Sequence, residues 1–584
     1  MRNARRRGVR HIAVVAALVT AALVSVTGTA RAATFTVDSN ADADAITCTT
    51  IPLGSGCSLR GAITMANATA ELDTIVFALA AGSTTISPAT PLPDITAPIF
   101  IDGTSQDTAA ATPPVTIDGS GAGMGANGLV LKDNADISTI RGLVINGFSG
   151  AGILIQATAT ENTIRGNFIG TNPGGTAADA NGVGIDIKSP KNSIGGPDAN
   201  HGNLISGNTG AGIAITDAAA TENIIRRNKI GTNAAGTGNV PNGGAGVLIS
   251  AGSKNQIGGT FTGAGNTIKG NTGAGVSITG PSANCPPTGL ATCENRINHN
   301  SINGNGGLGI DLAPTGATAN DAGDGDSGPN KLQNFPVLTS ATTGSTEIQG
   351  TLSSAPSTTY RVEFFAGPGC DASGSGEGDR FLGSINILTD TTGSFTFTTT
   401  LAATSTVGEV VTATATDPAG NTSEFSACKS VTQGQPPPPP PDGDDCTITG
   451  TSGGETLNGT SGDDVICGGG GNDTLVGLGG EDELIGGPGN DQLKGGGGSD
   501  TLKGGPGTDT LKGGGDDDTL NAGPDDDSAV GGGGNDTAKG GGGNDEAKGG
   551  GGNDNLRGGP GKDKVTGGPG FDSCKAEDEK SCEI

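Results

Sequence analysis

Near the C-terminus, aspartate recurs at every ninth position over thirteen consecutive repeats. Glycines precede each aspartate, and an aliphatic residue usually follows two positions later, as in Gly468–Val476 (GGGGNDTLV). A flexible acidic linker rich in glycine would carry no such phase. A short fixed period predicts stacked units, each built from a tight turn and a short strand. The phased residues are Asp464, Asp473, Asp482, Asp491, Asp500, Asp509, Asp518, Asp527, Asp536, Asp545, Asp554, Asp563 and Asp572.

The residue types in this unit predict a turn that binds metal. Glycine tolerates positive φ, so a glycine-rich run can turn tightly and expose its carbonyls. The aspartate adds a charged oxygen, and calcium takes about six to eight oxygens, which stacked turns can supply together. Side chains alternate along a strand, so the middle strand residue should point inward. These inward residues are Leu475, Leu484, Leu493, Leu502, Leu511 and Leu520.

Residues 447 to 573 resemble the RTX (haemolysin-type) calcium-binding repeat family. The resemblance implies a β-roll with two nonapeptides in each turn and calcium held between neighbouring turns. It also implies that calcium is the cofactor, and that the phased aspartates from Asp464 to Asp563 are its ligands.

Several repeats depart from the pattern. Asp516 and Asp525 stand where a turn glycine is expected, and they are strained if their φ angles are positive. Lys562 and Phe571 replace the Asn or Asp before the phased aspartate, so we expect the last two sites to be weak. Alanine in three successive repeats predicts a thin core there. These alanines are Ala529, Ala538 and Ala547.

Composition excludes several classes of protein. The chain has 584 residues, 109 of them glycine, with no Trp and one Tyr. A helical globular enzyme rarely has this composition. Proteins built from short strands joined by Gly and Asn turns commonly do. The net charge of −28 argues against a nucleic-acid partner, whose phosphates need Lys and Arg. It favours a cation, and it predicts that the acidic tail repels itself and stays unfolded without calcium.

The first 32 residues predict a signal peptide, and therefore a secreted, extracellular protein. Arginines come first, then an apolar run from Ile12 to Val26, then the small-x-small motif Ala30-Arg31-Ala32. The apolar run is shorter than the ~20 residues that a membrane span needs, and no later stretch is long enough. We expect no membrane span after the signal is removed. Retention at the cell surface stays open.

Ten cysteines fit export to an oxidising compartment, and they fall into near neighbours along the chain. Zinc is disfavoured because no CxxC pair exists. The predicted disulfides are Cys48–Cys57, Cys285–Cys293, Cys370–Cys428, Cys446–Cys467 and Cys574–Cys582.

Residues 33–95 predict a small N-terminal module. Thr34–Val37 alternates like a strand, and Cys57–Ile63 reads CSLRGAI. The module resembles the CSLREA-type module found ahead of bacterial β-helices, although Gly61 departs from it. The resemblance implies a cap over the open end of a solenoid. Arg60 is interpreted as one half of an ion pair in this cap, with ligand binding as the alternative.

Residues 96–337 repeat themselves. Thr160–Arg165 (TENTIR) recurs as Thr221–Arg226 (TENIIR), and short strands such as Ala151–Ile155 (AGILI) recur between Gly and Asn turns. Many short strands at a regular period predict a solenoid, and this one resembles the right-handed parallel β-helix of the pectate-lyase-like fold. We expect the repeated asparagines to stack and stabilise turns, rather than to contact a ligand. They are Asn192, Asn203, Asn255, Asn266 and Asn295.

The β-helix gives no clear catalytic residues. Polysaccharide lyases and hydrolases of this fold need carboxylates clustered on an outer face. Asp186 should point outward, but no acidic ladder forms, and His201 is isolated in the sequence. The positions equivalent to Asp186 in other units are Leu154, Ala214, Leu248 and Ser277. A polysaccharide lyase or hydrolase acting through the β-helix face therefore remains the alternative function.

The helix should end near Leu308–Leu338, where Asp321, Asp324 and Asp326 lie close together among glycines. They form either a second calcium loop or a solvated acidic turn. Nothing in the pattern separates these two interpretations.

Residues 338–432 contain four segments that alternate like strands, at intervals that suggest a β-sandwich. They are Thr346–Leu352, Tyr360–Phe365, Ser394–Leu401 and Val410–Thr416. The run Thr412–Phe425 resembles the last strands of bacterial Ig-like domains. Residues 433–445 contain a stiff polyproline spacer, and residues 446–584 form the calcium tail.

The sequence therefore predicts an all-β chain: a right-handed parallel β-helix, an Ig-like β-sandwich and a calcium-binding parallel β-roll. The predicted function is a secreted, calcium-binding surface or extracellular protein with a structural or adhesive role. Its expected partners are calcium ions and a cell-surface or matrix glycan or protein.

Overall fold

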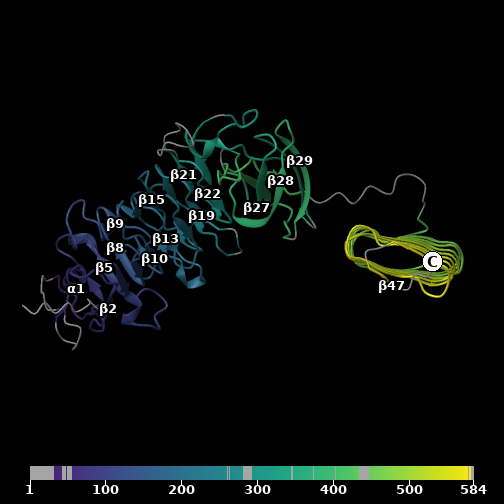
Figure 1. Cartoon of the computed structure of the whole chain (residues 1–584), viewed down its shortest axis with the longest axis horizontal. Coiled ribbons are helices and arrows are strands. Elements are labelled where there is room, and N and C mark those ends of the chain that lie inside the picture. Colours follow the sequence, from purple (N-terminus) through teal and green to yellow (C-terminus); the bar gives the residue numbers. More distant parts are fainter. Residues whose placement is uncertain are drawn as a thin grey trace, which may run out of the picture. The chain divides into compact units, whose positions relative to one another are not determined.

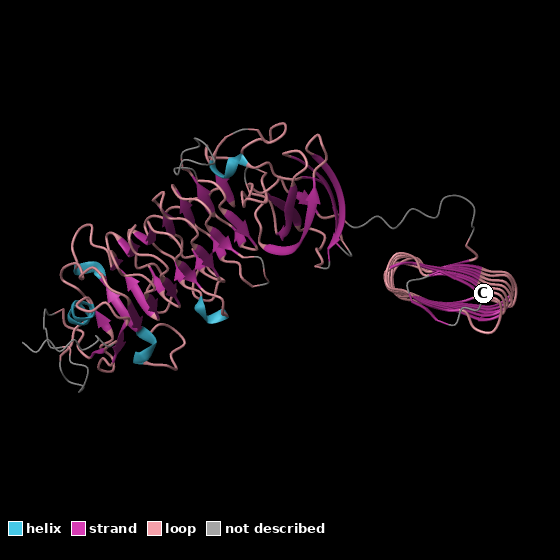
Figure 2. Cartoon of the chain, viewed as in Figure 1, coloured by secondary structure: helices cyan, strands magenta, loops and turns pink. Residues whose placement is uncertain are grey.

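The computed structural model describes residues 32–580 except 43–47, 49–55, 260, 262, 281–291, 326, 344–345, 372–373, 402, 433–445 and 576–577. The predicted signal peptide up to residue 31, the proline spacer, Asp326, Cys285 and Cys582 lie outside the described residues. The chain forms two compact units, Met1–Gln433 and Gly434–Ile584. Strands and loops make up almost all of both units (Figure 2).

Three parallel sheets form most of the first unit (Figure 1). Sheet A contains β1 (Thr34–Val37), β2 (Asp73–Phe77), β4 (Ile99–Asp102), β7 (Thr139–Arg141), β10 (Thr163–Arg165), β13 (Ser193–Gly195), β16 (Ile224–Arg226), β19 (Gln256–Gly258) and β22 (Arg296–Asn298). Sheet B contains β3 (Thr85–Ile86), β5 (Val115–Asp118), β8 (Leu143–Asn146), β11 (Phe168–Ile169), β14 (Leu204–Ile205), β17 (Lys229–Ile230), β20 (Thr267–Lys269) and β23 (Ser301–Asn303). Sheet C contains β6 (Leu129–Leu131), β9 (Ala151–Ile155), β12 (Val183–Ile187), β15 (Ile213–Ile215), β18 (Val247–Ile249), β21 (Val276–Ile278) and β24 (Ile310–Leu312).

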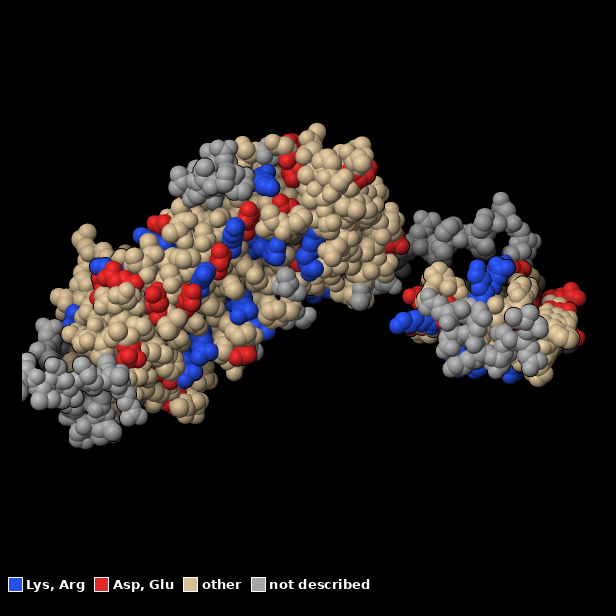
Figure 3. All heavy atoms as spheres, in the orientation of Figure 1, with Lys and Arg blue, Asp and Glu red and all other residues tan. Residues whose placement is uncertain are grey.

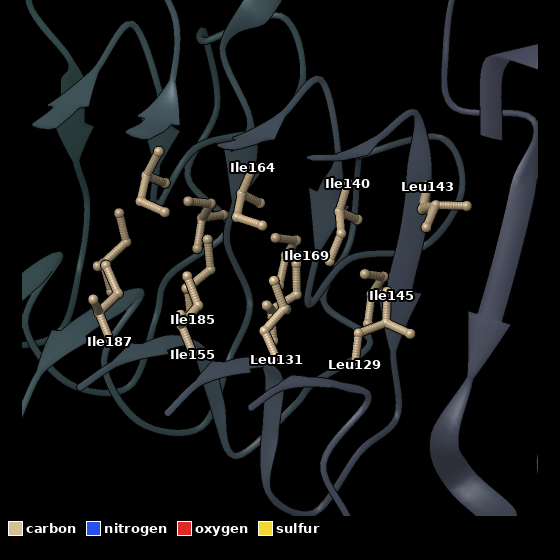
Figure 4. Close-up of a cluster of buried hydrophobic side chains, with 14 of the residues drawn as sticks. Leu129, Leu131, Ile140, Leu143, Ile145, Ile155, Ile164, Ile169, Ile185 and Ile187 are labelled. Atoms are coloured by element: carbon tan, nitrogen blue, oxygen red, sulfur yellow. The ribbon is translucent and has the colours of Figure 1, made fainter. Parts of the chain in front are cut away.

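The chain visits sheets A, B and C in turn, so each coil adds one strand to each sheet. One inward residue of every strand stacks on its counterpart, as Ile140, Ile164 and Ile194 do in sheet A. These residues are fully buried, and Figure 4 shows how such side chains fill the interior. Each buried isoleucine stabilises the fold by roughly 1.5–3 kcal/mol relative to exposure. A strand of three residues suffices because its neighbours on both sides supply the hydrogen bonds.

Buried asparagines form a ladder at each of the three corners. In most steps the side chain accepts a hydrogen bond from the backbone N–H of the asparagine one coil earlier, as Asn228 Oδ1 does from Asn203 at 3.1 Å. Asn208 and Asn271 accept instead from the side-chain Nδ2 of Asn181 and Asn242. This confirms the predicted turn-stabilising stacks. The ladders are Asn162–Asn192–Asn223–Asn255–Asn295, Asn167–Asn203–Asn228–Asn266–Asn300 and Asn181–Asn208–Asn242–Asn271–Asn305.

At the N-terminal end, α1 (Leu59–Ala66) packs on the β-helix core. Ser58 caps this helix by accepting a hydrogen bond from the Gly61 N–H. The Arg60 guanidinium bonds Asp42 at 2.7 Å, as the ion-pair interpretation predicts. The loops that the structure describes contain four short 3₁₀ helices: η1 (Gly103–Gln106), η2 (Gly119–Gly121), η3 (Ala199–His201) and η4 (Pro329–Leu332).

Two small antiparallel sheets follow the β-helix. One contains β25 (Val337–Thr342), β26 (Thr346–Ser353) and β29 (Ser394–Leu401), and the other contains β28 (Arg380–Leu388), β27 (Thr359–Gly367), β30 (Val410–Thr416) and β31 (Lys429–Ser430). They share one core, in which the rings of Phe364 and Phe397 meet edge to face with centroids 5.7 Å apart. Phe425 packs into the end of the β-helix core and covers it.

The second unit is a flattened coil of two parallel sheets, with both layers visible in Figure 1. One contains β32 (Ile448–Thr449), β34 (Val465–Cys467), β36 (Glu483–Ile485), β38 (Thr501–Lys503), β40 (Thr519–Pro524), β42 (Thr537–Gly542), β44 (Asn555–Arg557) and β46 (Ser573–Lys575). The other contains β33 (Thr456–Asn458), β35 (Thr474–Gly479), β37 (Gln492–Gly497), β39 (Thr510–Gly515), β41 (Ser528–Gly533), β43 (Glu546–Gly551), β45 (Lys564–Thr566) and β47 (Asp578–Lys580).

Paired strands in this coil stand one full turn apart in sequence, as Leu475, Leu493 and Leu511 do. One turn therefore consists of two nonapeptides. The predicted leucines are buried in one core, as one row from each sheet, and the three alanines that thin the core continue these rows. We refer to this unit as the roll.

Three of the predicted disulfides are present: Cys48–Cys57, Cys370–Cys428 and Cys446–Cys467. Each of the other two predicted pairs includes a cysteine outside the described residues. Over the described part of the chain, no helix combines the length and apolarity that crossing a membrane requires.

Candidate metal centre

The phased aspartates lie at the ends of the turns of the roll, directly before each strand. All of them are buried, with exposed fractions between 0% for Asp509 and 8% for Asp464. A buried carboxylate needs hydrogen bonds or a cation to offset the loss of water. The two oxygens of each carboxylate meet this need in different ways.

From Asp473 onward, one oxygen of each carboxylate, Oδ1, accepts a backbone hydrogen bond that links neighbouring turns. Oδ1 of Asp491 accepts a hydrogen bond at 2.7 Å from the backbone N–H of Asp473, one turn earlier. Oδ1 of Asp509 accepts in the same way from Asp491 at 2.8 Å. The same bond recurs from Asp464 through Asp572, so two continuous ladders tie the turns together.

The other carboxylate oxygen has no partner. Buried polar atoms almost always have one, so a series of orphans at equivalent positions indicates an absent ligand. Carboxylate oxygens accept only, which makes that ligand a cation or a donor. The orphaned atoms are Oδ2 of Asp473, Asp482, Asp491, Asp500, Asp509, Asp518, Asp527, Asp536, Asp545, Asp554, Asp563 and Asp572.

All but one of the orphaned oxygens face a space that glycine leaves open. A Cβ placed on Gly468 would lie 2.7 Å from Asp473 Oδ2 and 2.6 Å from the Gly486 carbonyl oxygen. A Cβ on Gly477 would overlap Oδ2 of Asp482. A carboxylate oxygen and a carbonyl oxygen from the next turn thus converge on one small space. We call each such space a cradle.

Burial raises the pKa of the phased aspartates from Asp473 to Asp554. The pKa rises to about 7 for Asp509 and Asp518, and to about 6 for Asp491 and Asp527. Neighbouring phased aspartates add repulsion between like charges to the effect of burial. The stack therefore holds its negative charge poorly unless a cation shares the space.

Calcium fits this donor set. It prefers oxygen ligands, both carboxylate and carbonyl, and tolerates irregular geometry. Among the described residues, no three His, Cys, Asp or Glu side chains cluster closely enough to hold a metal by themselves. Carbonyl oxygens of the glycine turns must therefore complete any coordination shell.

Asp464 differs from the later members. Its Oδ2 accepts hydrogen bonds from the Thr460 N–H at 2.6 Å and from the Thr460 hydroxyl at 2.9 Å. These bonds lower the pKa of Asp464, opposite to the direction for its neighbours in the stack. Both oxygens of the first phased aspartate therefore already accept hydrogen bonds, which a cation would have to displace.

The departures from the repeat lie where the sequence predicts them. Asp516 and Asp525 have φ angles of 72° and 84°, in the left-handed region that glycine favours. Lys562 and Phe571 still donate their N–H groups to Asn544 and Asn553, one turn earlier. Their own side chains offer no such acceptor to a later turn.

The sequence reasoning missed Ala522. It occupies the cradle position that is glycine before the other phased aspartates, and its side chain is fully buried. By the repeat, its Cβ corresponds to the Cβ that would meet Oδ2 of the phased aspartate if Gly504 or Gly513 were alanine. A comparison of the first residue of every nonapeptide would have revealed it.

The other acidic candidates have structural partners. Asp324 accepts hydrogen bonds from the Asn334 N–H at 2.9 Å and from the Ser354 hydroxyl at 2.7 Å. Asp321 Oδ2 accepts from the Gly325 N–H at 3.1 Å, while its buried Oδ1 has no partner. With Asp326 outside the described residues, the second calcium loop stays a prediction.

Asp186 lies in register with Leu154 and Ala214, which confirms the predicted equivalence. It bonds the Thr216 hydroxyl at 2.6 Å and lies 3.4 Å from the Lys188 ammonium. Its immediate partners on the sheet carry no charge.

Family comparisons agree with both halves of the molecule. Residues 99–290 match the model described as a right-handed β-helix region. Residues 449–484, 468–502, 476–511, 503–538 and 539–574 match the model of the RTX calcium-binding nonapeptide repeat. No curated protein matches the chain.

The fold and the phased carboxylates thus define a modular all-β protein with calcium-binding repeats. In particular, the chain combines a right-handed β-helix region with C-terminal RTX calcium-binding nonapeptide repeats.

Proposed function

We propose that this is a secreted extracellular protein whose roll folds when the phased aspartates from Asp464 to Asp563 bind calcium. The twelve orphaned carboxylate oxygens carry the proposal. Asp464 and the sites near Lys562 and Phe571 should bind least tightly.

The energetics support folding coupled to binding. Without a cation, the roll must bury a stack of carboxylates whose pKa values burial raises. Its core consists of one row of small and medium side chains from each sheet, which gives limited apolar burial. Calcium, when bound, supplies positive charge between the carboxylates, so its binding free energy becomes folding free energy.

This coupling suits export. A chain that stays unfolded where calcium is scarce can pass a secretion channel and fold outside the cell. The N-terminal basic and apolar run and the paired cysteines also support secretion from the cell.

The remaining parts support a structural or adhesive role. The β-helix presents a long, regular flank, and we propose that the two antiparallel sheets form an Ig-like sandwich that closes its end. A cell-surface or matrix glycan or protein is the proposed partner. A lyase or hydrolase acting through the β-helix is the alternative, tested by turnover of pectin or alginate.

Hydrogen exchange on the whole secreted chain tests calcium-driven folding. Peptides from residues 446–575 should exchange fast in a chelator and slowly in calcium, while peptides from residues 99–280 stay protected in both. The β-helix peptides are thus an internal control. Equal protection of the roll with and without calcium would overturn the proposal.

A further inference from the structure

A groove on the β-helix collects cationic side chains in a strongly acidic protein. Its volume is about 680 Å³, and it lies at the corner between sheets A and B over successive coils. Asp107 is the one carboxylate among its lining residues. The basic lining residues are Arg141, Arg165, His201, Arg227 and Lys229. Figure 3 shows Lys and Arg side chains in a row along this unit, although the net charge of the chain is −28.

The fold sets the spacing of these cations. Arg141 and Arg165 are register partners on β7 and β10, so their backbones are about 4.8 Å apart. The next strand carries Gly195 at this position, and Arg226 follows on β16. His201 lies beside Arg165, which donates from Nη1 to His201 Nε2 at 2.8 Å. Burial and Arg165 lower the pKa of His201, so the imidazole is a neutral acceptor that orients the guanidinium.

Much of the positive charge in the groove is uncompensated. Asp102 neutralises Arg141 through two hydrogen bonds of 2.9 and 2.7 Å. Within the described part of the chain, no carboxylate pairs with Arg165 or Arg227. The Nε atoms of both are buried and make no hydrogen bond. A buried cationic donor without a partner is costly, and an anion in the groove would supply one.

Arg227 has a backbone conformation that costs energy. Its φ is 60°, at the position that glycine holds on two earlier coils, Gly142 and Gly166. Its guanidinium carbon lies 5.9 Å from the centre of the Phe261 ring. His299, at the equivalent position after β22, has a φ of 56°, so this corner accepts side chains as well as glycine in the left-handed conformation.

We propose that this groove binds an acidic polysaccharide through its sulfate or carboxylate groups. Guanidinium forks match such oxyanions with paired hydrogen bonds. An open groove that crosses coils suits an extended chain with charges at intervals. The groove gives nucleobases little to stack on, since Phe168 is the one Phe, Tyr or Trp among its lining residues.

Binding of charged and neutral dextrans to the whole chain tests the proposal. Dextran sulfate, carboxymethyl dextran and plain dextran share one backbone, so they separate sulfate and carboxylate recognition from general sugar binding. We expect either or both charged forms to bind and plain dextran not to bind. Measurement in chelator as well as in calcium separates this groove from the roll, because groove binding should persist without calcium.

The groove variant is Arg165→Gln with Arg227→Gln. Its matched control is Lys188→Gln with Lys254→Gln, which removes the same charge elsewhere on the β-helix. We expect about a tenfold or greater loss of affinity in the groove variant, from lost charge-assisted hydrogen bonds, and little change in the control. If the double variant folds poorly, Arg227→Gln alone is the test. This single variant keeps the Arg165–His201 contact, and we expect it to bind the charged dextrans more weakly than the unmodified chain does.

Two results would overturn the proposal. If the groove variant and the control variant lose the same affinity for the charged dextrans, the binding depends on the overall charge of the β-helix and not on this groove. Displacement of dextran sulfate by an equivalent concentration of inorganic sulfate would show a site for a single anion rather than for a polysaccharide.

Discussion

The N–H of Asp491 donates to Oδ1 of Asp509 at 2.8 Å, while Oδ2 of Asp509 is buried with no partner. One side chain thus performs two tasks: one oxygen holds neighbouring turns together, and the other faces the cradle. The division explains why the residue is aspartate. Asparagine could supply the acceptor for the ladder, but it has no second anionic oxygen.

Asp509→Asn separates these two tasks. The ladder bond survives because the amide oxygen still accepts, so the fold of the calcium-loaded roll should persist. We expect about one calcium ion fewer per chain and a higher calcium midpoint for folding. Titration calorimetry and hydrogen exchange measure both quantities. Asp517→Asn is the control, since Asp517 is exposed, and a similar loss there would contradict the assignment.

Ala522→Gly should open the cradle that faces Asp527. We expect tighter calcium binding by the roll, because Oδ2 of Asp527 gains the space that the other repeats have. Gly504→Ala is the reverse change, since a Cβ at that position would overlap Oδ2 of Asp509. It should weaken binding and raise the calcium midpoint. If the two substitutions shift the midpoint in the same direction, the cradle does not control affinity.

The calcium-free roll should be more stable in acid. The pKa of Asp509 and Asp518 is about 7 in the fold, against about 3.9 for an unfolded aspartate. The folded roll therefore binds protons that the unfolded chain releases, and its stability falls as pH rises. The contribution of these carboxyls to the free energy of unfolding is fully present below about pH 4, and it is lost as the pH rises through about 6 to 7.

Calcium affinity should change with pH in the opposite sense, since protons compete for the same oxygens. The stability of the calcium-free roll is measured by hydrogen exchange of residues 446–575 in chelator, from pH 4.5 to pH 8, after correction for intrinsic exchange rates. Protection in chelator that increases with pH would reverse the predicted sign.

Asn228→Ala should destabilise the β-helix. The change removes the acceptor for the Asn203 N–H and the donor to the Ile194 carbonyl, and both groups are buried. We expect a loss of about 2–5 kcal/mol in the free energy of unfolding, from buried groups left unpaired. Denaturant unfolding in chelator measures it without calcium stabilisation.

Asn233→Ala is the matched control for that substitution. The Asn233 side chain bonds only Thr237, in a loop outside the ladders. Its removal should cost about 1 kcal/mol or less. Equal costs at the two positions would mean that the ladder adds nothing beyond an ordinary turn bond.

The sequence alone determined every feature that depends on a period. The nine-residue phase specifies the turns, the inward leucines and the buried aspartates, because each repeat must place identical residues in identical environments. The same logic predicted the asparagine stacks and the equivalence of Asp186 with Leu154. Four strands of the antiparallel sheets were also predicted, since their residues alternate, while β25, β28 and β31 were not.

Only the tertiary structure decided features made by distant or individual contacts. The spacing of Asp491 and Asp509 cannot reveal which carboxylate oxygen anchors the ladder, since that depends on a turn eighteen residues away. The groove between Arg141, Arg165 and Arg227 exists because coiling brings separate repeats to one corner. Local pattern specifies the repeating unit, whereas charge compensation and open space depend on what the neighbouring coils place beside it.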